Sequence, residues 1–307
     1  MSLHYSVKIL VSLLLASNVY AVQVIGTTGN TTAPVDDPGF ANIGTLNGAS
    51  AIYLGDRWVL TASHVGSGSV IFGGTTYTVS GPVTQLTNMG TPGMTSQTDM
   101  ILFQINADPG LPSLTISPGA AAPGDDLMMI GNGTNRNSFR SFYSVVQGPG
   151  VNDDVWTAVG GPGAGVQELF LPSSGNAVRW GTNDVDSAGL NVNAGSGSVR
   201  SFATVFDDDP TGRPNEAQGV LGDSGSGVFR KDGLGNWQLL GMTHAIGSVS
   251  GYDNIPASPA SSVIGDSATF VADLSFYRTQ ILTVIPEPGS ATLAAAGLLG
   301  LLRRRRA

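Results

Sequence analysis

The chain has 307 residues, with 14 basic and 22 acidic side chains, a formal net charge of −8 and no cysteine. The negative charge argues against nucleic-acid binding, which requires basic side chains facing the phosphates, and the lack of cysteine excludes disulfides, thiolate metal ligands and thiol nucleophiles. The 41% of hydrophobic residues suffice for a sizeable core. The 43 glycines have no three-residue period, which excludes a collagen-like chain and favours short strands joined by tight turns.

Residues 1–21 are predicted to form a signal peptide. A lysine precedes the apolar run Ile9–Ala16, and the small side chains of Val19 and Ala21 stand three and one before the expected cut. This order of basic, apolar and small residues is typical of a secretory signal. The alternative is a buried first strand or helix. An extended lead-in over residues 22–40 follows, rich in Thr, Gly, Pro and Asp.

The middle of the chain is predicted to be all-β. Short runs of Val, Ile, Thr and aromatic residues recur between turn residues, which favours an antiparallel barrel or sandwich over alternating β/α units. The main predicted strands are Ala51–Leu54, Trp58–Thr61, Ser69–Phe72, Thr75–Val79, Met100–Ile105, Leu127–Ile130, Ser141–Val146, Val199–Phe206, Gly227–Arg230 and Trp237–Met242. One helix is predicted after Asp273, where Leu274, Tyr277 and Ile281 fall on one face.

The C-terminus combines three features in order. A Pro-Glu-Pro sequence at 286–288 precedes the thirteen mostly apolar residues 290–302 and four arginines at 303–306. Thirteen residues are short for a membrane span, which needs roughly 17–25, and the arginines would stay on the cytoplasmic side. This layout resembles the PEP-CTERM sorting signal of exported bacterial proteins. The resemblance implies that residues 284–307 hold the precursor in the membrane until an exosortase-type enzyme cuts near Pro286; the alternative is an ordinary weak anchor.

Three short segments carry side chains suited to nucleophilic catalysis. His64 follows an apolar strand, Asp99 leads into a strongly hydrophobic one, and Ser224 lies within the glycine-rich Gly222–Val228. Beyond the signal peptide the only histidines are His64 and His244, so any histidine base is one of these two. A carboxylate beside a buried strand needs donors such as a histidine ring, and flanking glycines expose a serine hydroxyl and let N–H groups converge on an oxyanion. Taken singly, each is also an ordinary strand-end or turn residue.

Together the three segments resemble the histidine, aspartate and serine boxes of the trypsin-like (chymotrypsin-fold) serine peptidases, in that family's order. The matching sequences are Thr61-Ala62-Ser63-His64, Thr98-Asp99-Met100-Ile101-Leu102 and Gly222-Asp223-Ser224-Gly225. The resemblance spans residues 41–283 and implies two antiparallel six-stranded β-barrels with a short C-terminal helix. It implies that Ser224 is the nucleophile, His64 its base and Asp99 the group that orients the base. The backbone N–H groups of Gly222 and Ser224 would form the oxyanion hole, and no metal or cofactor is implied.

The chain departs from the family pattern in several places. Ser63 stands where alanine is usual. Activated family members pair a new N-terminal amino group with the aspartate before the serine, here Asp223. Only Val24-Ile25-Gly26 resembles their N-terminal sequence, with no basic cleavage residue before it, so local amides or an arginine are alternative partners. Gln218, six residues before the serine, replaces the aspartate of trypsins and argues against cleavage after Arg or Lys. His244 is expected either to line the specificity pocket, favouring acidic side chains, or to be a hydrogen-bonded strand residue.

These observations predict a serine endopeptidase, exported from a bacterium to its cell envelope or extracellular matrix, that acts on protein or peptide substrates. Its other expected partners are an exosortase-type enzyme and, transiently, the inner membrane; nucleic acid is not expected. One alternative is a catalytically silent trypsin-like module for matrix assembly or adhesion, and another is an esterase using the same triad. The occupation of all three triad positions favours an enzyme, because silent relatives usually lose one.

Overall fold

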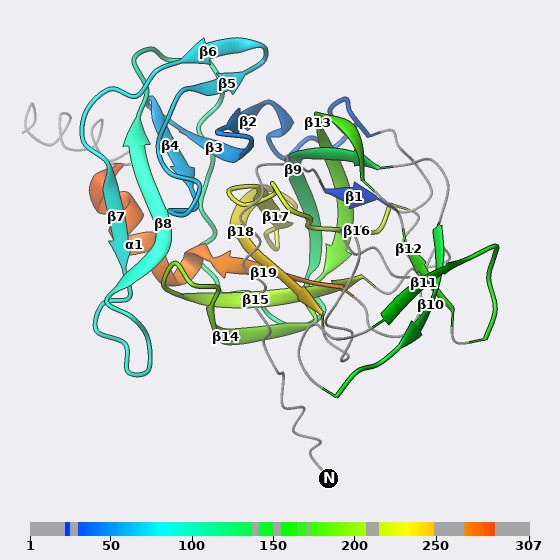
Figure 1. Cartoon of the computed structure of the whole chain (residues 1–307). Helices are drawn as coiled ribbons and strands as arrows, with labels where there is room; N and C mark the ends of the chain where they lie inside the picture. The colour runs from blue at the N-terminus through cyan, green and yellow to red at the C-terminus, as the bar shows by residue number, and fades with distance from the viewer. Residues whose placement is uncertain are drawn as a thin grey trace, which may run out of the picture.

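The computed structural model describes residues 22–24, 30–136, 141–149, 155–164, 166–169, 172–206, 215–248 and 267–285. It is a mostly β protein built on two antiparallel seven-stranded sheets, with a helix at the end of the described chain (Figure 1). The predicted all-β fold is confirmed, although each sheet has seven strands where six were expected. The predicted signal peptide and all but two residues of the sorting signal lie outside the described residues.

The first sheet is formed by the N-terminal half of the domain, after a short 3-10 helix at Phe40–Asn42. Its strands, in spatial order, are β6 (Thr75–Tyr77), β5 (Val70–Phe72), β2 (Ile43–Leu46), β3 (Ala49–Gly55), β4 (Trp58–Thr61), β8 (Gln97–Gln104) and β7 (Thr84–Thr87). Gly73 and Gly74, both with positive φ, form the predicted tight turn between β5 and β6. The central strand β3 is buried along its whole length, because its two faces pack into different hydrophobic clusters, Ile52 and Leu54 into one and Ala51 and Tyr53 into another.

The second sheet is formed by the C-terminal half. Its strands, in spatial order, are β13 (Pro172–Asp184), β9 (Asp126–Arg136), β17 (Gly227–Lys231), β18 (Trp237–Ser248), β19 (Ser267–Asp273), β15 (Ser198–Phe206) and β14 (Ser187–Asn193). A separate three-stranded sheet has the order β11 (Val155–Val159), β10 (Ser141–Val146) and β12 (Val166–Leu169). The N-terminal strand β1 (Gln23–Val24) pairs with β16 (Ala217–Gln218), which brings the start of the described chain close to the segment before Ser224.

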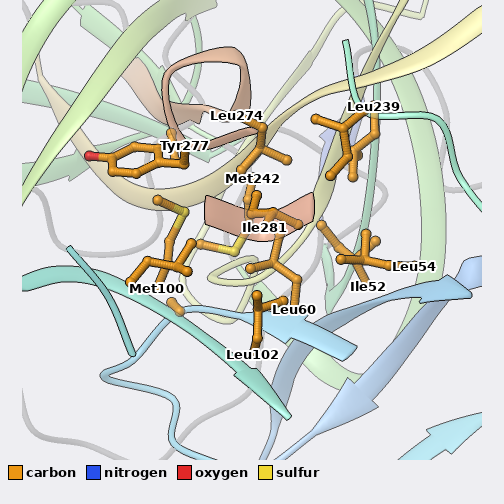
Figure 2. Close-up of a cluster of buried hydrophobic side chains, with 14 of the residues drawn as sticks. Ile52, Leu54, Leu60, Met100, Leu102, Leu239, Met242, Leu274, Tyr277 and Ile281 are labelled. Atoms are coloured by element: carbon orange, nitrogen blue, oxygen red, sulfur yellow. The ribbon is translucent and has the colours of Figure 1, made fainter. Parts of the chain in front are cut away.

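Helix α1 (Leu274–Val284) packs between the sheets and buries the predicted face of Leu274, Tyr277 and Ile281. Asp273 caps it, accepting a hydrogen bond from the Ser275 N–H at 3.0 Å. Figure 2 shows these three side chains in one cluster with residues of both sheets: Ile52, Leu54, Leu60, Met100 and Leu102 from the first, and Leu239 and Met242 from the second. Burial of this shared apolar surface holds the two sheets together, and so fixes the positions of the side chains that each contributes to the site.

Candidate active site

The first sheet brings His64 and Asp99 together through the pairing of β4 with β8. Thr61 lies opposite Ile101 in this antiparallel pair, so two residues further along Ser63 faces Asp99, and the Ser63 N–H donates to the Asp99 carbonyl at 3.2 Å. His64 is the next residue, and its backbone N–H donates to Asp99 Oδ1 at 2.9 Å. The strand register and these two backbone hydrogen bonds therefore place the imidazole beside the carboxylate.

The second sheet contributes Ser224 from the loop that precedes β17. Gly222 and Gly225 have φ values of +92° and +88°, which let the chain turn sharply on either side of the serine. Ser50 of β3 ties this loop to the first sheet: its N–H donates to the Ser224 carbonyl at 3.0 Å and its hydroxyl to the Gly222 carbonyl at 3.2 Å. The Gly225 N–H donates to the carbonyl of Thr243 in β18 at 2.8 Å. Both sheets therefore position the serine.

The three side chains form one continuous hydrogen-bonded chain. His64 Nδ1 lies 2.6 Å from Asp99 Oδ2, and His64 Nε2 lies 2.8 Å from Ser224 Oγ. Asp99 is 1% exposed, whereas the His64 side chain reaches solvent. Because a carboxylate only accepts hydrogen bonds, Nδ1 carries the ring proton and Nε2 is left as the acceptor for the hydroxyl proton. The structure thus brings together the three residues that the sequence motifs identified.

Two backbone N–H groups beside the serine are open to a ligand. The N–H groups of Asp223 and Gly225 donate to backbone carbonyls, whereas in the described part of the chain those of Gly222 and Ser224 donate no hydrogen bond. N–H donors left open next to a nucleophilic hydroxyl are suited to stabilise the charge of an oxyanion.

The carboxyl group of Asp223 is fully buried behind the serine loop. Burial raises its pKa well above the ordinary value, while backbone N–H groups of Val220 and Val22 and the nearby Arg179 lower it. The Val220 N–H donates to Oδ2 at 2.9 Å, but Oδ1 has no hydrogen bond of ordinary geometry to any described residue. A buried carboxylate with one oxygen unpaired is unfavourable unless a further donor or a positive charge approaches it.

The described N-terminal residue whose backbone N–H lies against the Asp223 carboxyl group is Val22. Ile25 and Gly26, from the sequence that resembles the family's N-terminus, lie outside the described residues. Val22 is 1% exposed, and a Cβ atom built on Gly131 would lie 2.2 Å from Asp223 Oδ1 and 2.8 Å from the Val22 side chain. Both groups therefore lie against the same glycine. Val22 is also the residue that directly follows the predicted signal-peptide cut after Ala21.

Replacing Gly225 with alanine is expected to destabilise the fold strongly. A Cβ atom there would lie 2.0 Å from the Ser50 carbonyl oxygen and 2.4 Å from Thr61 Oγ1, and the φ of +88° is itself unfavourable for alanine. We expect the free energy of unfolding in urea to fall by about 3 kcal/mol or more. Gly233→Ala is the matched control, because a Cβ atom added there would have no neighbour within 4 Å. Similar losses in the two variants would contradict the packing described for the serine loop.

The structure buries both residues that the sequence suggested for specificity. Gln218 is 0% exposed, and neither amide atom has a hydrogen-bond partner among the described residues. His244 is 2% exposed, with Nε2 2.9 Å from Ser201 Oγ. Burial lowers the pKa of His244 to about 4, an effect that the nearby Asp99 opposes and His64 reinforces. A neutral, buried imidazole offers no charge to an acidic side chain, so these contacts favour the strand-histidine interpretation.

Lowering the pH from 7 to 4 is expected to destabilise the protein through His244. Its pKa is about 4 in the folded protein and about 6.5 in an unfolded chain, so the unfolded chain takes up the proton first. The stability present above pH 6.5 is therefore lost as the pH falls toward 4, by about 3 kcal/mol for this group. Unfolding measured across this range in wild type and His244→Gln isolates the effect, since other groups such as Asp223 titrate in both. Equal slopes of unfolding free energy against pH in the two proteins would contradict this role of His244.

Sequence reasoning missed Ser50, which links the two sheets at the serine loop. Besides its two bonds to that loop, its Oγ accepts from the N–H of Asn132 in β9 at 3.0 Å. Ser50 is 0% exposed within a strand whose neighbours are mostly apolar. A small polar residue in a fully buried strand is the one local signal of such a role, because buried hydroxyls need partners.

Comparison with solved structures finds similarity to proteases at low identity. A structure described as kallikrein-related peptidase 10 in complex with Zn²⁺ has a TM-score of 0.45 and 12% identity, covering 84% of this chain and 98% of that chain. The Rv3671c protease in its inactive form has a TM-score of 0.40 and 14% identity, covering 81% and 90%. The HtrA-type protease AlgW with a decapeptide has a TM-score of 0.40 and 18% identity, covering 77% and only 52%. Similarity at this level says nothing about activity, which depends on the site itself.

The C-terminal segment has a clearer relationship. A search among curated proteins finds no significant match, but a family model for the PEP-CTERM protein-sorting motif matches residues 284–306. In the described parts of the chain no helix is long and apolar enough to cross a membrane, and the apolar residues 290–302 lie outside those parts. The chain therefore carries a PEP-CTERM protein-sorting motif, which indicates export to the cell envelope or exterior of a bacterium.

Proposed function

We propose that this protein is a secreted serine endopeptidase that hydrolyses peptide bonds. The observation that carries the proposal is the chain of hydrogen bonds from Asp99 Oδ2 through His64 to Ser224 Oγ, with distances of 2.6 and 2.8 Å. A hydroxyl within reach of a neutral imidazole, which a buried carboxylate in turn orients, is the arrangement that activates serine as a nucleophile. The open N–H groups beside Ser224 support the same reaction.

In the proposed reaction, Ser224 Oγ attacks the carbonyl carbon of the scissile bond while His64 Nε2 takes the hydroxyl proton. The N–H groups of Gly222 and Ser224 bind the oxyanion that forms. His64 then gives its proton to the leaving amine, the C–N bond breaks, and an acyl ester on Ser224 remains. A water molecule, deprotonated by His64, hydrolyses that ester. Asp99 holds the ring tautomer throughout and stabilises the imidazolium.

The proposed substrates are not selected by a positive charge. Gln218 is a neutral amide at the position where the resemblance to trypsins would place an aspartate, so that position supplies no carboxylate for an Arg or Lys side chain. Cleavage of a diverse peptide library is expected to show cuts after Arg and Lys no more often than their share of the library. A strong excess of such cuts would contradict this assignment of Gln218.

Two processing steps are part of the proposal. A signal peptidase would remove residues 1–21, so that the exported chain begins at Val22, and an exosortase-type enzyme would cut near Pro286 after the sorting segment has held the chain transiently in the inner membrane. The first step would convert the Val22 backbone N–H, which lies against the buried Asp223 carboxyl group, into an α-ammonium group. This is the charge pairing that the family resemblance implies, and Val22 would supply it.

The proposed function is tested by covalent labelling. Ser224 is expected to react with a fluorophosphonate probe, because His64 makes its hydroxyl nucleophilic, and peptide mapping would locate the adduct. Turnover of matched amide and ester substrates then defines the reaction. A chain that the probe does not label would be a silent module, and a labelled chain that cleaves esters but no amides would be an esterase; either result would overturn the endopeptidase assignment.

A further inference from the structure

Ser63 lies directly against the carboxylate that orients the proposed base. Its Oγ donates to Asp99 Oδ1 at 2.8 Å, next to the bond that the His64 backbone N–H makes to the same oxygen. This is the position where the trypsin-like pattern has alanine, which has no hydroxyl to donate. We propose that Ser63, held in place by Gln85, is a positioning residue that fixes the Asp99 carboxylate for catalysis. This inference rests on the proposed function.

The direction of the hydrogen bond from Ser63 follows from the neighbouring donors. Gln85 Nε2 donates to the Thr98 carbonyl at 2.9 Å and to Ser63 Oγ at 3.4 Å. The carbonyl can only accept, so the amide nitrogen of Gln85 must be the atom that faces it, and this nitrogen has two protons for its two acceptors. Ser63 Oγ therefore accepts from Gln85 and has its single proton left for Asp99.

The two carboxylate oxygens of Asp99 have different hydrogen-bond partners. Oδ1 of Asp99 receives two donors, the Ser63 hydroxyl and the His64 backbone N–H, while Oδ2 faces only the His64 ring. With Oδ1 held from two directions, the carboxylate cannot rotate about its Cβ–Cγ bond, and Oδ2 stays aimed at Nδ1. Asp99 is 1% exposed, so water does not readily replace a donor that is removed.

In the described part of the chain, no other side chain donates a hydrogen bond to Asp99 Oδ1. Besides His64, Ser63 is the only residue there whose side chain bonds to the Asp99 carboxylate. His244 also lies near enough to Asp99 to feel its charge, but its Nε2 bonds to Ser201 and its Nδ1 has no partner among the described residues. Ser63 is therefore the only side-chain donor to Oδ1 in that part of the chain, beside the backbone N–H of His64.

Gln85 is itself anchored by its strand. It lies on β7, where the pairing with β8 shifts register between Gln85 and Thr87, and Gln280 of α1 holds Thr87 by hydrogen bonds to both its N–H and its carbonyl, at 3.1 and 2.8 Å. Figure 1 shows α1 alongside β7. The support of Asp99 thus extends from the helix through β7 to Ser63.

The test is made in the full chain, expressed with its leader in an exporting bacterium so that processing proceeds. Ser63→Ala is expected to lower kcat about tenfold on a peptide substrate, with KM changed by less than about twofold, because orientation of the base and not substrate binding is lost. The rate constant for fluorophosphonate labelling of Ser224 should fall by the same factor. Ser63→Thr, which keeps the hydroxyl, should restore both, and Gln85→Ala should cause a smaller loss.

Ser67→Ala is the matched control, an exposed serine four residues along the chain, and should behave as wild type. Wild-type labelling and kcat in Ser63→Ala would overturn the positioning role while leaving the proposed function intact. A loss that Ser63→Thr fails to restore, with equal thermal unfolding temperatures in the two variants, would also overturn it. If the wild-type chain is not labelled at all, both proposals fail together.

Discussion

Replacing Ser224 with alanine is expected to lower peptide turnover by a factor on the order of 10³ or more. The hydroxyl that His64 Nε2 contacts at 2.8 Å is the proposed nucleophile, and without it only binding and the open N–H groups can promote hydrolysis. The measurement is kcat on a cleaved peptide, together with fluorophosphonate labelling, which should disappear. Unchanged turnover in Ser224→Ala would refute the assignment of the nucleophile.

Ser226 provides a control from the same loop. It is 0% exposed, and its Oγ has no hydrogen-bond partner among the described residues, so it cannot reach a substrate carbonyl. Ser226→Ala is expected to keep kcat and the labelling rate within about twofold of wild type. The pair of variants therefore separates the chemistry of one hydroxyl from general disturbance of a glycine-rich loop.

A chain that begins at Val22 is expected to be on the order of 10² more active than one that retains Ala21. A free α-amino group at Val22 would bring a positive charge and additional donors to the buried Asp223 carboxyl group, whose Oδ1 is otherwise unpaired in the described chain. An amide N–H brings no charge and only a single donor. Because Asp223 adjoins the serine, an unpaired charge there would disturb the N–H groups of Gly222 and Ser224.

The comparison uses two proteins whose N-termini are verified by mass spectrometry, assayed for kcat/KM and for labelling rate. Asp223→Asn tests the origin of the effect, since a neutral amide has no charge to pair. Both N-termini should then give the same low activity, as expected when two groups act as a coupled pair. Equal activity of the two N-termini in the presence of Asp223 would show that leader removal does not affect the site.

Local sequence patterns predicted much of the fold. β4 and β10 have the predicted bounds, and α1 buries the predicted face. The 13-residue strand β13 was not predicted, because its proline, glycines and asparagines have low strand propensity. It forms through its pairing with β9, and Gly181 within it is needed because a Cβ atom there would lie 2.4 Å from the Cβ of Ala217. Such a contact between distant segments leaves no periodic signal in the sequence.

The candidate site shows the same difference between features with a local sequence pattern and contacts between distant segments. His64, Asp99 and Ser224 could be predicted, because the three short segments that contain them, taken together, resemble the boxes of the trypsin-like family in that family's order, although each segment taken singly has an ordinary structural explanation. The approach of Val22 to Asp223 and the support of Ser63 by Gln85 could not, because each is a single contact between residues that are separated in the chain. Prediction from local motifs therefore reaches the proposed reacting groups but not the groups that hold them in place.

The contacts of Ser50 imply an order of events during folding. This one residue of the first sheet binds the Gly222 and Ser224 carbonyls and receives the N–H of Asn132 from the second. Neither half of the molecule on its own can give the nucleophile its final geometry. The proposed nucleophile would therefore reach its final geometry only after the two sheets have packed against each other.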